Sequence, residues 1–177
     1  MARKLISRYT QRLYRMGGGM QVELGLSKKA LDEAAEKLGD VLADTYALYL
    51  KSQNFHWNLK GMEFFSLHLL FEKHYEELAD AVDEIAERIQ SLGAEVEASL
   101  GAFHKRTTVP DPKPRRTARQ MLKELLEGHE EISRKARPLI PRLQELKDEA
   151  SADLLIKRLG IHEKAAWMLR SHLEGSK

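Results

Sequence analysis

Two pairs of residues in the segment 68–87, one a histidine with a carboxylate and the other two carboxylates, have the residue types and the spacing of metal ligands. His68 and Glu72 are four residues apart, and so are Asp83 and Glu87. Residues four apart share one face of a helix, and the eleven residues from Glu72 to Asp83 make nearly three whole turns. The four side chains therefore project in similar directions, as ligands of one kind of site would.

One copy of this helix cannot close such a site. His68 and Asp83 are fifteen residues apart, about 22 Å along a helix, which is too far for two ligands of one ion. If two copies packed antiparallel around a twofold axis, each His68 and Glu72 end would meet the other copy's Asp83 and Glu87 end, which makes two equivalent sites. His56, in the stretch "NFHWNLKG" (54–61), could supply a second imidazole. Imidazoles with several carboxylates suit iron.

The same helix allows a second interpretation of its acidic residues. It carries seven acids between positions 72 and 87 against one lysine, Lys73. Like charges at i, i+4 spacing destabilise a helix, so a cation must offset them. A neighbouring helix with Lys or Arg could do this for Glu76, Glu77 and Glu84, and a bound metal could do it for the others.

Periodicity predicts the elements that must position these residues. Four amphipathic helical patterns run from Ser27 to about 57, from about 64 to 92, from Thr117, and from about Ser151 to the end. A short helix is expected at about 97–104 in the long connection 94–116. Pro138 and Pro141 should kink or shorten the third pattern. The sequence thus predicts an all-α four-helix bundle with a short extra helix.

Composition fits one compact domain. The chain has 177 residues, of which 42% are hydrophobic and 32% charged, and it lacks an apolar run long enough to cross a membrane. The absence of cysteine excludes thiolate metal sites and favours a reducing cytoplasm. We expect a bundle domain at 27–177 after a basic arm at 1–26. The arm could be a transit peptide, a solvated terminus or a DNA-binding segment with the contacts Arg3, Lys4, Arg8, Arg12 and Arg15.

The segment "NFHWNLKGMEFFSLHLLFEKHYEELADAVDEIAERIQSLG" resembles the signature of the Dps family of mini-ferritins, and the ending "IHEKAAWMLRSHLE" agrees with it. This resemblance implies a ferritin-like bundle in a hollow homododecamer. Such a shell oxidises Fe(II), preferably with hydrogen peroxide rather than oxygen, stores ferric mineral and protects DNA from oxidative damage. The larger ferritins match less well, because their Glu-x-x-His pattern is absent.

The resemblance also implies roles for individual residues. The ferroxidase ligands would be His56, His68 and Glu72 of one subunit with Asp83 and Glu87 of its twofold mate, and Glu72 stands where many members have aspartate. Trp57 could intercept radicals beside the site or be an ordinary packing aromatic. "LKDEASADLL" resembles the family's pore segment, which makes pore-lining candidates of Asp148, Glu149 and Asp153, although Asp153 could equally favour the dipole of its helix.

Two other functions remain open on the sequence. A nucleoid-compacting DNA-binding protein with a secondary metal site is the alternative, because a second basic stretch, 105–119, adds to the arm. A bundle that binds zinc or manganese without redox chemistry has the same ligand types. The remaining histidines have no evident shared partners in the sequence and are interpreted as structural or surface residues: His74, His104, His129, His162 and His172.

Overall fold

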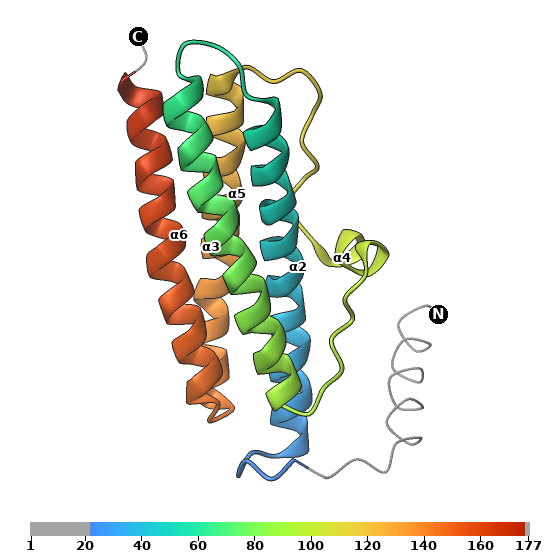
Figure 1. Ribbon diagram of the computed structural model, residues 1–177. Helices are drawn as coiled ribbons and strands as arrows, with labels where there is room; N and C mark the ends of the chain where they lie inside the picture. Colours follow the sequence, from blue (N-terminus) through green and yellow to red (C-terminus); the bar gives the residue numbers. More distant parts are fainter. Residues whose placement is uncertain (1–21, 176–177) are drawn as a thin grey trace.

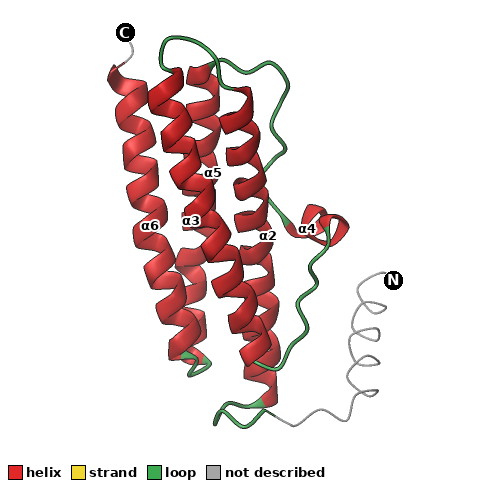
Figure 2. Cartoon of the chain, in the orientation of Figure 1, coloured by secondary structure: helices red, strands yellow, loops and turns green. Residues whose placement is uncertain are grey.

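The structure, a computed structural model, describes residues 22–175, and all regular secondary structure in this range is helical (Figure 2). The helices, labelled as in Figure 1, are α2 (Lys28–Asn58), α3 (Phe64–Ser91), α4 (Leu100–Arg106), α5 (Ala118–Glu145) and α6 (Glu149–Gly175). The four long helices form a bundle, and α4 lies in the connection between α3 and α5. The predicted all-α four-helix bundle with a short extra helix is therefore confirmed.

Side-chain caps set the starts of most helices, and a glycine follows the end of α3. The Ser27 hydroxyl accepts a hydrogen bond from the Ala30 amide at 3.2 Å, directly before α2. Thr117 and Gln120 form the predicted capping box at the start of α5. Gly93 follows α3 with φ +79°, a conformation that side-chain-bearing residues rarely adopt. These ends agree with the sequence because each depends on a local contact.

Three predicted elements differ in their bounds: α4, α5 and the start of α6. The short helix α4 begins at Leu100 and not near 97, because the Ser99 hydroxyl caps it by accepting from the Ala102 amide at 3.1 Å. The helix α5 includes both Pro138 and Pro141 and continues to Glu145, so the prolines do not shorten it. Both proline rings are exposed. Burial of the apolar face of α5 offsets the loss of two backbone donors.

The connection between α3 and α5 crosses the outside of the bundle. Residues 92–117 run back along α2, against which α4 packs (Figure 1). As a result α2 and α3 form one antiparallel hairpin, α5 and α6 form a second, and α3 and α5 run in the same direction. A bundle with one long crossover of this kind is the ferritin-like connectivity.

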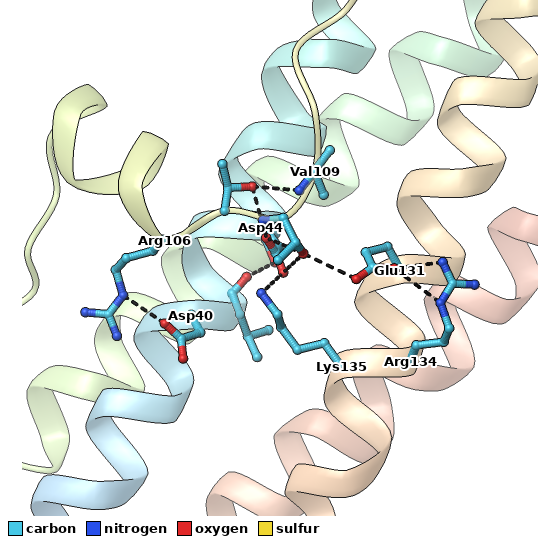
Figure 3. A network of polar contacts seen from close by, with 11 residues as sticks. Asp40, Asp44, Arg106, Val109, Glu131, Arg134 and Lys135 are labelled. Atoms are coloured by element: carbon cyan, nitrogen blue, oxygen red, sulfur yellow. Dashed lines mark hydrogen bonds and ion pairs between the residues drawn. The ribbon is translucent and has the colours of Figure 1, made fainter.

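Asp44 of α2 fastens this crossover to the bundle. Its side chain is fully buried and accepts hydrogen bonds from the Thr107 hydroxyl at 2.9 Å and the Thr108 amide at 2.6 Å. It also forms an ion pair with Lys135 of α5 (Figure 3). Because one carboxylate joins α2, the crossover and α5, its loss would leave several buried polar groups unpaired.

Replacing Asp44 with alanine is expected to lower the free energy of unfolding by about 3 to 5 kcal/mol, the usual cost of breaking a buried ion pair from one side. The matched control is Asp40→Ala. Asp40 binds Arg106 at 3.0 Å, but its side chain is 35% exposed, so that its loss should cost about 1 kcal/mol or less. Urea unfolding followed by circular dichroism measures both. Equal losses in the two variants would contradict the role assigned to Asp44.

Candidate metal site

The end of α2 and the start of α3 bring His56 and His68 together. Their rings stack with centroids 3.7 Å apart and an interplanar angle of 18°. The Nδ1 atom of His56 lies 3.0 Å from the His68 carbonyl oxygen, and the Nδ1 atom of His68 lies 3.1 Å from the His56 carbonyl oxygen. The turn at residues 59–63 thus holds the two imidazoles in a reciprocal arrangement.

This arrangement fixes the tautomer of both rings. A carbonyl oxygen can only accept, so each Nδ1 carries the hydrogen and donates it. In an imidazole of this tautomer, the Nε2 atom has its lone pair available for a metal. Backbone carbonyls commonly orient metal-binding histidines in this way.

Glu72 lies one turn after His68 on α3, and Tyr75 contacts both parts of this group. The Tyr75 hydroxyl donates a long hydrogen bond, 3.3 Å, to Glu72 Oε1. The Tyr75 ring meets the His56 ring edge-on, with centroids 5.2 Å apart. Desolvation, followed by the negative charge of Glu72, raises the pKa of Tyr75, which keeps its hydroxyl protonated as a donor.

Asp83 and Glu87 lie far along α3 from this group. Both side chains are exposed, and neither forms a hydrogen bond or ion pair with the rest of residues 22–175. Within the described range, no group of three or more His, Cys, Asp or Glu side chains converges in a way that could hold a metal ion. One chain therefore brings His56 and His68 together, connects Glu72 to them only through Tyr75, and leaves Asp83 and Glu87 apart from all three.

Two other acids of α3 have the cationic partners that the sequence allowed. Glu77 forms an ion pair with Arg158 of α6, and Glu84 binds Lys157 at 2.7 Å. These contacts confirm, for Glu77 and Glu84, that a neighbouring helix offsets part of the acidic ladder. Glu76 is exposed.

Large apolar side chains close in sequence to His56 and His68 are exposed, and the Phe64 ring stacks on that of His68. Trp57 is 68% exposed and Phe65 is 75% exposed, although His56 between them is buried. The exposed apolar rim, defined as Trp57, Met62, Phe64, Phe65 and Leu69, covers the turn between α2 and α3. Several exposed large apolar side chains within one short segment are typical of a contact with another protein surface.

The pore candidates lie at the start of α6. Asp148 is buried, and its Oδ1 atom accepts from Arg88 at 2.5 Å and from the Ser151 amide at 3.1 Å. This carboxylate caps α6, which explains why the helix begins at Glu149 and not at Ser151. Glu149 and Asp153 are exposed. The pore assignment stays a prediction for all three residues.

Three histidines from different helices meet in the interior of the bundle. His74 of α3, His129 of α5 and His162 of α6 are at most 6% exposed. The Nδ1 atoms of His129 and His162 are 2.9 Å apart, and the His74 and His129 rings lie edge to face at 5.1 Å. The sequence analysis interpreted these residues as structural or surface histidines and did not predict this buried histidine trio. Their spacing in the sequence does not indicate that the three rings pack together.

Burial lowers the pKa of every member of the buried histidine trio. Desolvation lowers the pKa of His74 to about 4 and that of His162 to about 3. The pKa of His129 is also lowered, first by desolvation and then by its histidine neighbours. The positive charge of Arg158 adds to the effect on His129 and His162. All three rings are therefore neutral near pH 7.

Part of the second basic stretch is used within the chain. Arg106 binds Asp40, and Arg116 forms an ion pair with Glu124. Arg119 donates to the Leu173 carbonyl at 3.0 Å. The side chains of Lys113 and Arg115 are exposed, so fewer cations are available to a nucleic acid here than the sequence suggested. The arm residues at positions 3–15 lie outside the described range.

Known proteins resemble the chain over most of its length. A ferritin-like domain matches residues 35–177. DNA protection during starvation protein 2 of Bacillus anthracis is 35% identical, over 80% of this chain and 97% of that protein. DpsC from Streptomyces coelicolor superposes with a TM-score of 0.84 at 34% identity, over 87% of this chain and 91% of that one. A Dps protein from Vibrio cholerae O1, described as one of the ferritin-like diiron-carboxylate proteins, gives 0.83 at 28% identity, over 89% and 99%.

The single long crossover and the match over residues 35–177 define a ferritin-like protein. With the Dps-named relatives and structures at these coverages, the chain belongs to the Dps family of mini-ferritins. Iron storage and protection of DNA are the general roles that this membership supports. Among the described residues, no helix is long and apolar enough to span a membrane.

Proposed function

We propose that this protein is a ferroxidase whose site is shared between two subunits. His56, His68 and Glu72 of one subunit would bind ferrous iron, the substrate, together with Asp83 and Glu87 of its twofold mate. The observation that carries the proposal is the separation along α3: two oriented imidazoles at one end, and two carboxylates without partners at the other. An antiparallel pair of α3 helices would join these ends twice.

The exposed apolar rim supports burial by a second copy. Trp57, Phe65 and Leu69 are 68%, 75% and 46% exposed in one chain. They flank the same imidazoles that lack their carboxylate partners. A twofold contact would remove apolar area from water at the place where it completes the ligand set.

The chemistry follows from the ligand types. Two ferrous ions that are held close together each give one electron to hydrogen peroxide, and with two protons the products are two ferric ions and two waters. No hydroxyl radical is released in this two-electron step. The imidazoles favour the ferrous state, and the hard carboxylate oxygens stabilise the ferric product. We propose peroxide as the preferred oxidant over oxygen, and storage of the ferric product as mineral in a hollow homododecamer.

Anaerobic loading with Fe(II), followed by peroxide or by oxygen, tests this function. The wild-type protein should show fast growth of ferric absorbance, faster with peroxide, and His56→Ala and Asp83→Ala should both lose it. Gel filtration tests the assembly, because twelve chains of 20.3 kDa make about 244 kDa. Binding of Zn(II) or Mn(II) without any ferrous oxidation would favour the non-redox alternative instead.

We also propose Asp153 and Glu149 as pore residues, with Asp148 positioned behind them. Acids around a symmetry axis would concentrate cations at the entrance to the shell. Asp153→Asn with Glu149→Gln is expected to slow ferrous uptake and leave the oligomer intact, as measured by stopped-flow absorbance and gel filtration. The matched control is Glu163→Gln, which changes an exposed acid farther along α6. Unchanged uptake in the double variant would remove the pore assignment.

DNA binding is the second function, and the basic arm favours it. Arg3, Lys4, Arg8, Arg12 and Arg15 precede the first acid, Glu23. Twelve such arms on one shell would make many weak phosphate contacts, whose sum depends strongly on salt. The protein would then lie with the nucleoid in the cytoplasm. The competing role for the arm is packing on the shell.

A gel shift with linear DNA separates the two roles of the arm. At low salt the full chain should retard DNA of any sequence, and a chain that lacks residues 1–20 should not, because the phosphate contacts are lost. Raising the salt concentration should abolish retardation by the full chain. Equal retardation by both proteins would show that the arm does not bind DNA.

A further inference from the structure

We propose that Tyr75, Tyr49 and Tyr46 form a tyrosine chain that takes an electron hole away from the shared site when a one-electron oxidant forms there. The inference rests on the proposed function, which supplies ferrous iron and peroxide to His56, His68 and Glu72. It adds an oxidisable path within the subunit, which the ligand set itself does not contain.

Ring contacts trace the path from the site into the subunit. The Tyr75 ring lies 5.2 Å from the His56 ring, and its hydroxyl donates to Glu72. The Tyr49 ring lies 6.4 Å from that of Tyr75, and the Tyr46 ring lies 5.8 Å from that of Tyr49, in edge-to-face geometry. These separations are those of aromatic neighbours in contact, across which an electron can pass readily.

The path ends beneath the crossover. Tyr46 packs on Phe103 of α4, with ring centroids 4.7 Å apart. Phenylalanine has no phenol and is far harder to oxidise, so the hole would stop at Tyr46. Along α2, Tyr46 is ten residues from His56, about 15 Å. A radical there would lie away from the iron ligands. The bundle would shield part of it from solvent, because Tyr46 is half-buried.

Trp57 is in a poorer position for this task. It follows His56 directly, but adjacent helix residues point in directions about 100° apart. His56 is buried and Trp57 is 68% exposed, and no ring contact joins Trp57 to another described residue. Tyr75, by comparison, contacts two candidate ligands.

The chemistry balances with reagents that the proposed function supplies. When only one ferrous ion is present, it gives one electron to peroxide, which yields ferric iron, hydroxide and a hydroxyl radical. The radical takes one electron from Tyr75, and the phenol proton passes through Glu72, so that the products are water and a Tyr75 phenoxyl radical. Tyr49 then gives one electron to the Tyr75 radical, which regains a proton through Glu72, and the half-buried Tyr49 releases its own phenol proton to solvent. Tyr46 gives one electron to the Tyr49 radical, with a proton lost from Tyr46 and one regained by Tyr49 through solvent.

The test uses the full-length protein with ferrous iron below one ion per site. Peroxide is added, samples are freeze-quenched for electron paramagnetic resonance, and ferric absorbance is recorded in parallel. The wild type should show a tyrosyl signal, and Tyr75→Phe should lose most of that signal per ferric ion formed, whatever its rate of ferrous oxidation. Tyr46→Phe should keep a tyrosyl signal that decays sooner. Thermal melting checks that each Phe variant, which keeps the ring, is folded.

The remaining tyrosines provide the matched control. Tyr9 and Tyr14 complete the five tyrosines of the sequence and lie outside the described residues; their double replacement by Phe should leave the signal unchanged. Ferric absorbance without any tyrosyl signal in the wild type, or a full signal in Tyr75→Phe, overturns the tyrosine chain alone. Absence of ferric absorbance in the wild type overturns the proposed function, and the chain with it.

Discussion

Co-expression of His56→Ala and Asp83→Ala chains is expected to restore ferrous oxidation that neither variant shows alone. In a mixed twofold pair, one site would combine both defects. The other would combine the intact imidazoles of the Asp83→Ala chain with the intact carboxylates of the His56→Ala chain. Random pairing would make about a quarter of all sites complete. The expected activity, measured as ferric absorbance, is therefore about a quarter of the wild-type value.

A second mixture is the matched control for this complementation. His56→Ala and Glu72→Ala both damage the same half of the site, so that every site in a mixed pair keeps one defect. This mixture should stay inactive. Recovery in the control mixture, or none in the test mixture when gel filtration shows complete assemblies, would contradict a site that is shared between subunits.

The second large effect is a loss of stability in mild acid. The pKa of each member of the buried histidine trio is lowered from an ordinary value of about 6.5 in the unfolded chain, to about 4 for His74 and about 3 for His162. The unfolded chain therefore binds more protons than the folded chain below pH 6.5. Stability is fully present above pH 6.5 and falls as the pH drops, by about 1.4 kcal/mol per pH unit for each histidine.

Urea unfolding at pH 6.5, 6, 5.5 and 5 measures this slope. His129→Gln with His162→Gln should reduce it by about 3 kcal/mol per pH unit, since two of the three titrating rings are gone. Carboxylates titrate mostly below this window. The quantity compared is the change of unfolding free energy per pH unit, so a lower stability of the double variant at every pH does not affect the comparison. His104→Gln, which changes an exposed histidine, is the control and should keep the wild-type slope; an unchanged slope in the double variant would contradict the interpretation.

The fold could be predicted largely from local signals. The cap at Ser27, the capping box at Thr117 and the glycine at 93 each act within a few residues, so the sequence shows them directly. The start of α6 was placed two residues late because its local cap was overlooked: the Asp148 carboxylate accepts from the Ser151 amide. The expectation that Pro138 and Pro141 would shorten α5 was wrong because packing on other helices, and not local propensity, decides whether α5 continues.

The candidate site was predictable in its composition and only partly in its geometry. Spacing along α3 showed that His68 and Glu72 share a face with Asp83, and that one chain cannot unite them. It could not show the reciprocal bonds of His56 and His68, which depend on how the turn at 59–63 closes. The buried histidine trio and the contacts of Tyr75 depend on packing between helices, for which sequence spacing carries no signal.

The hairpin topology has a consequence for the order in which the protein is made. All five proposed iron ligands, both the imidazole end and the carboxylate end, belong to the hairpin of α2 and α3. The ribosome completes this hairpin before it begins α5. A nascent chain therefore possesses one half of each of two proposed shared iron sites while the second hairpin is still untranslated, and only the later docking of α5 and α6 gives that hairpin a stable partner.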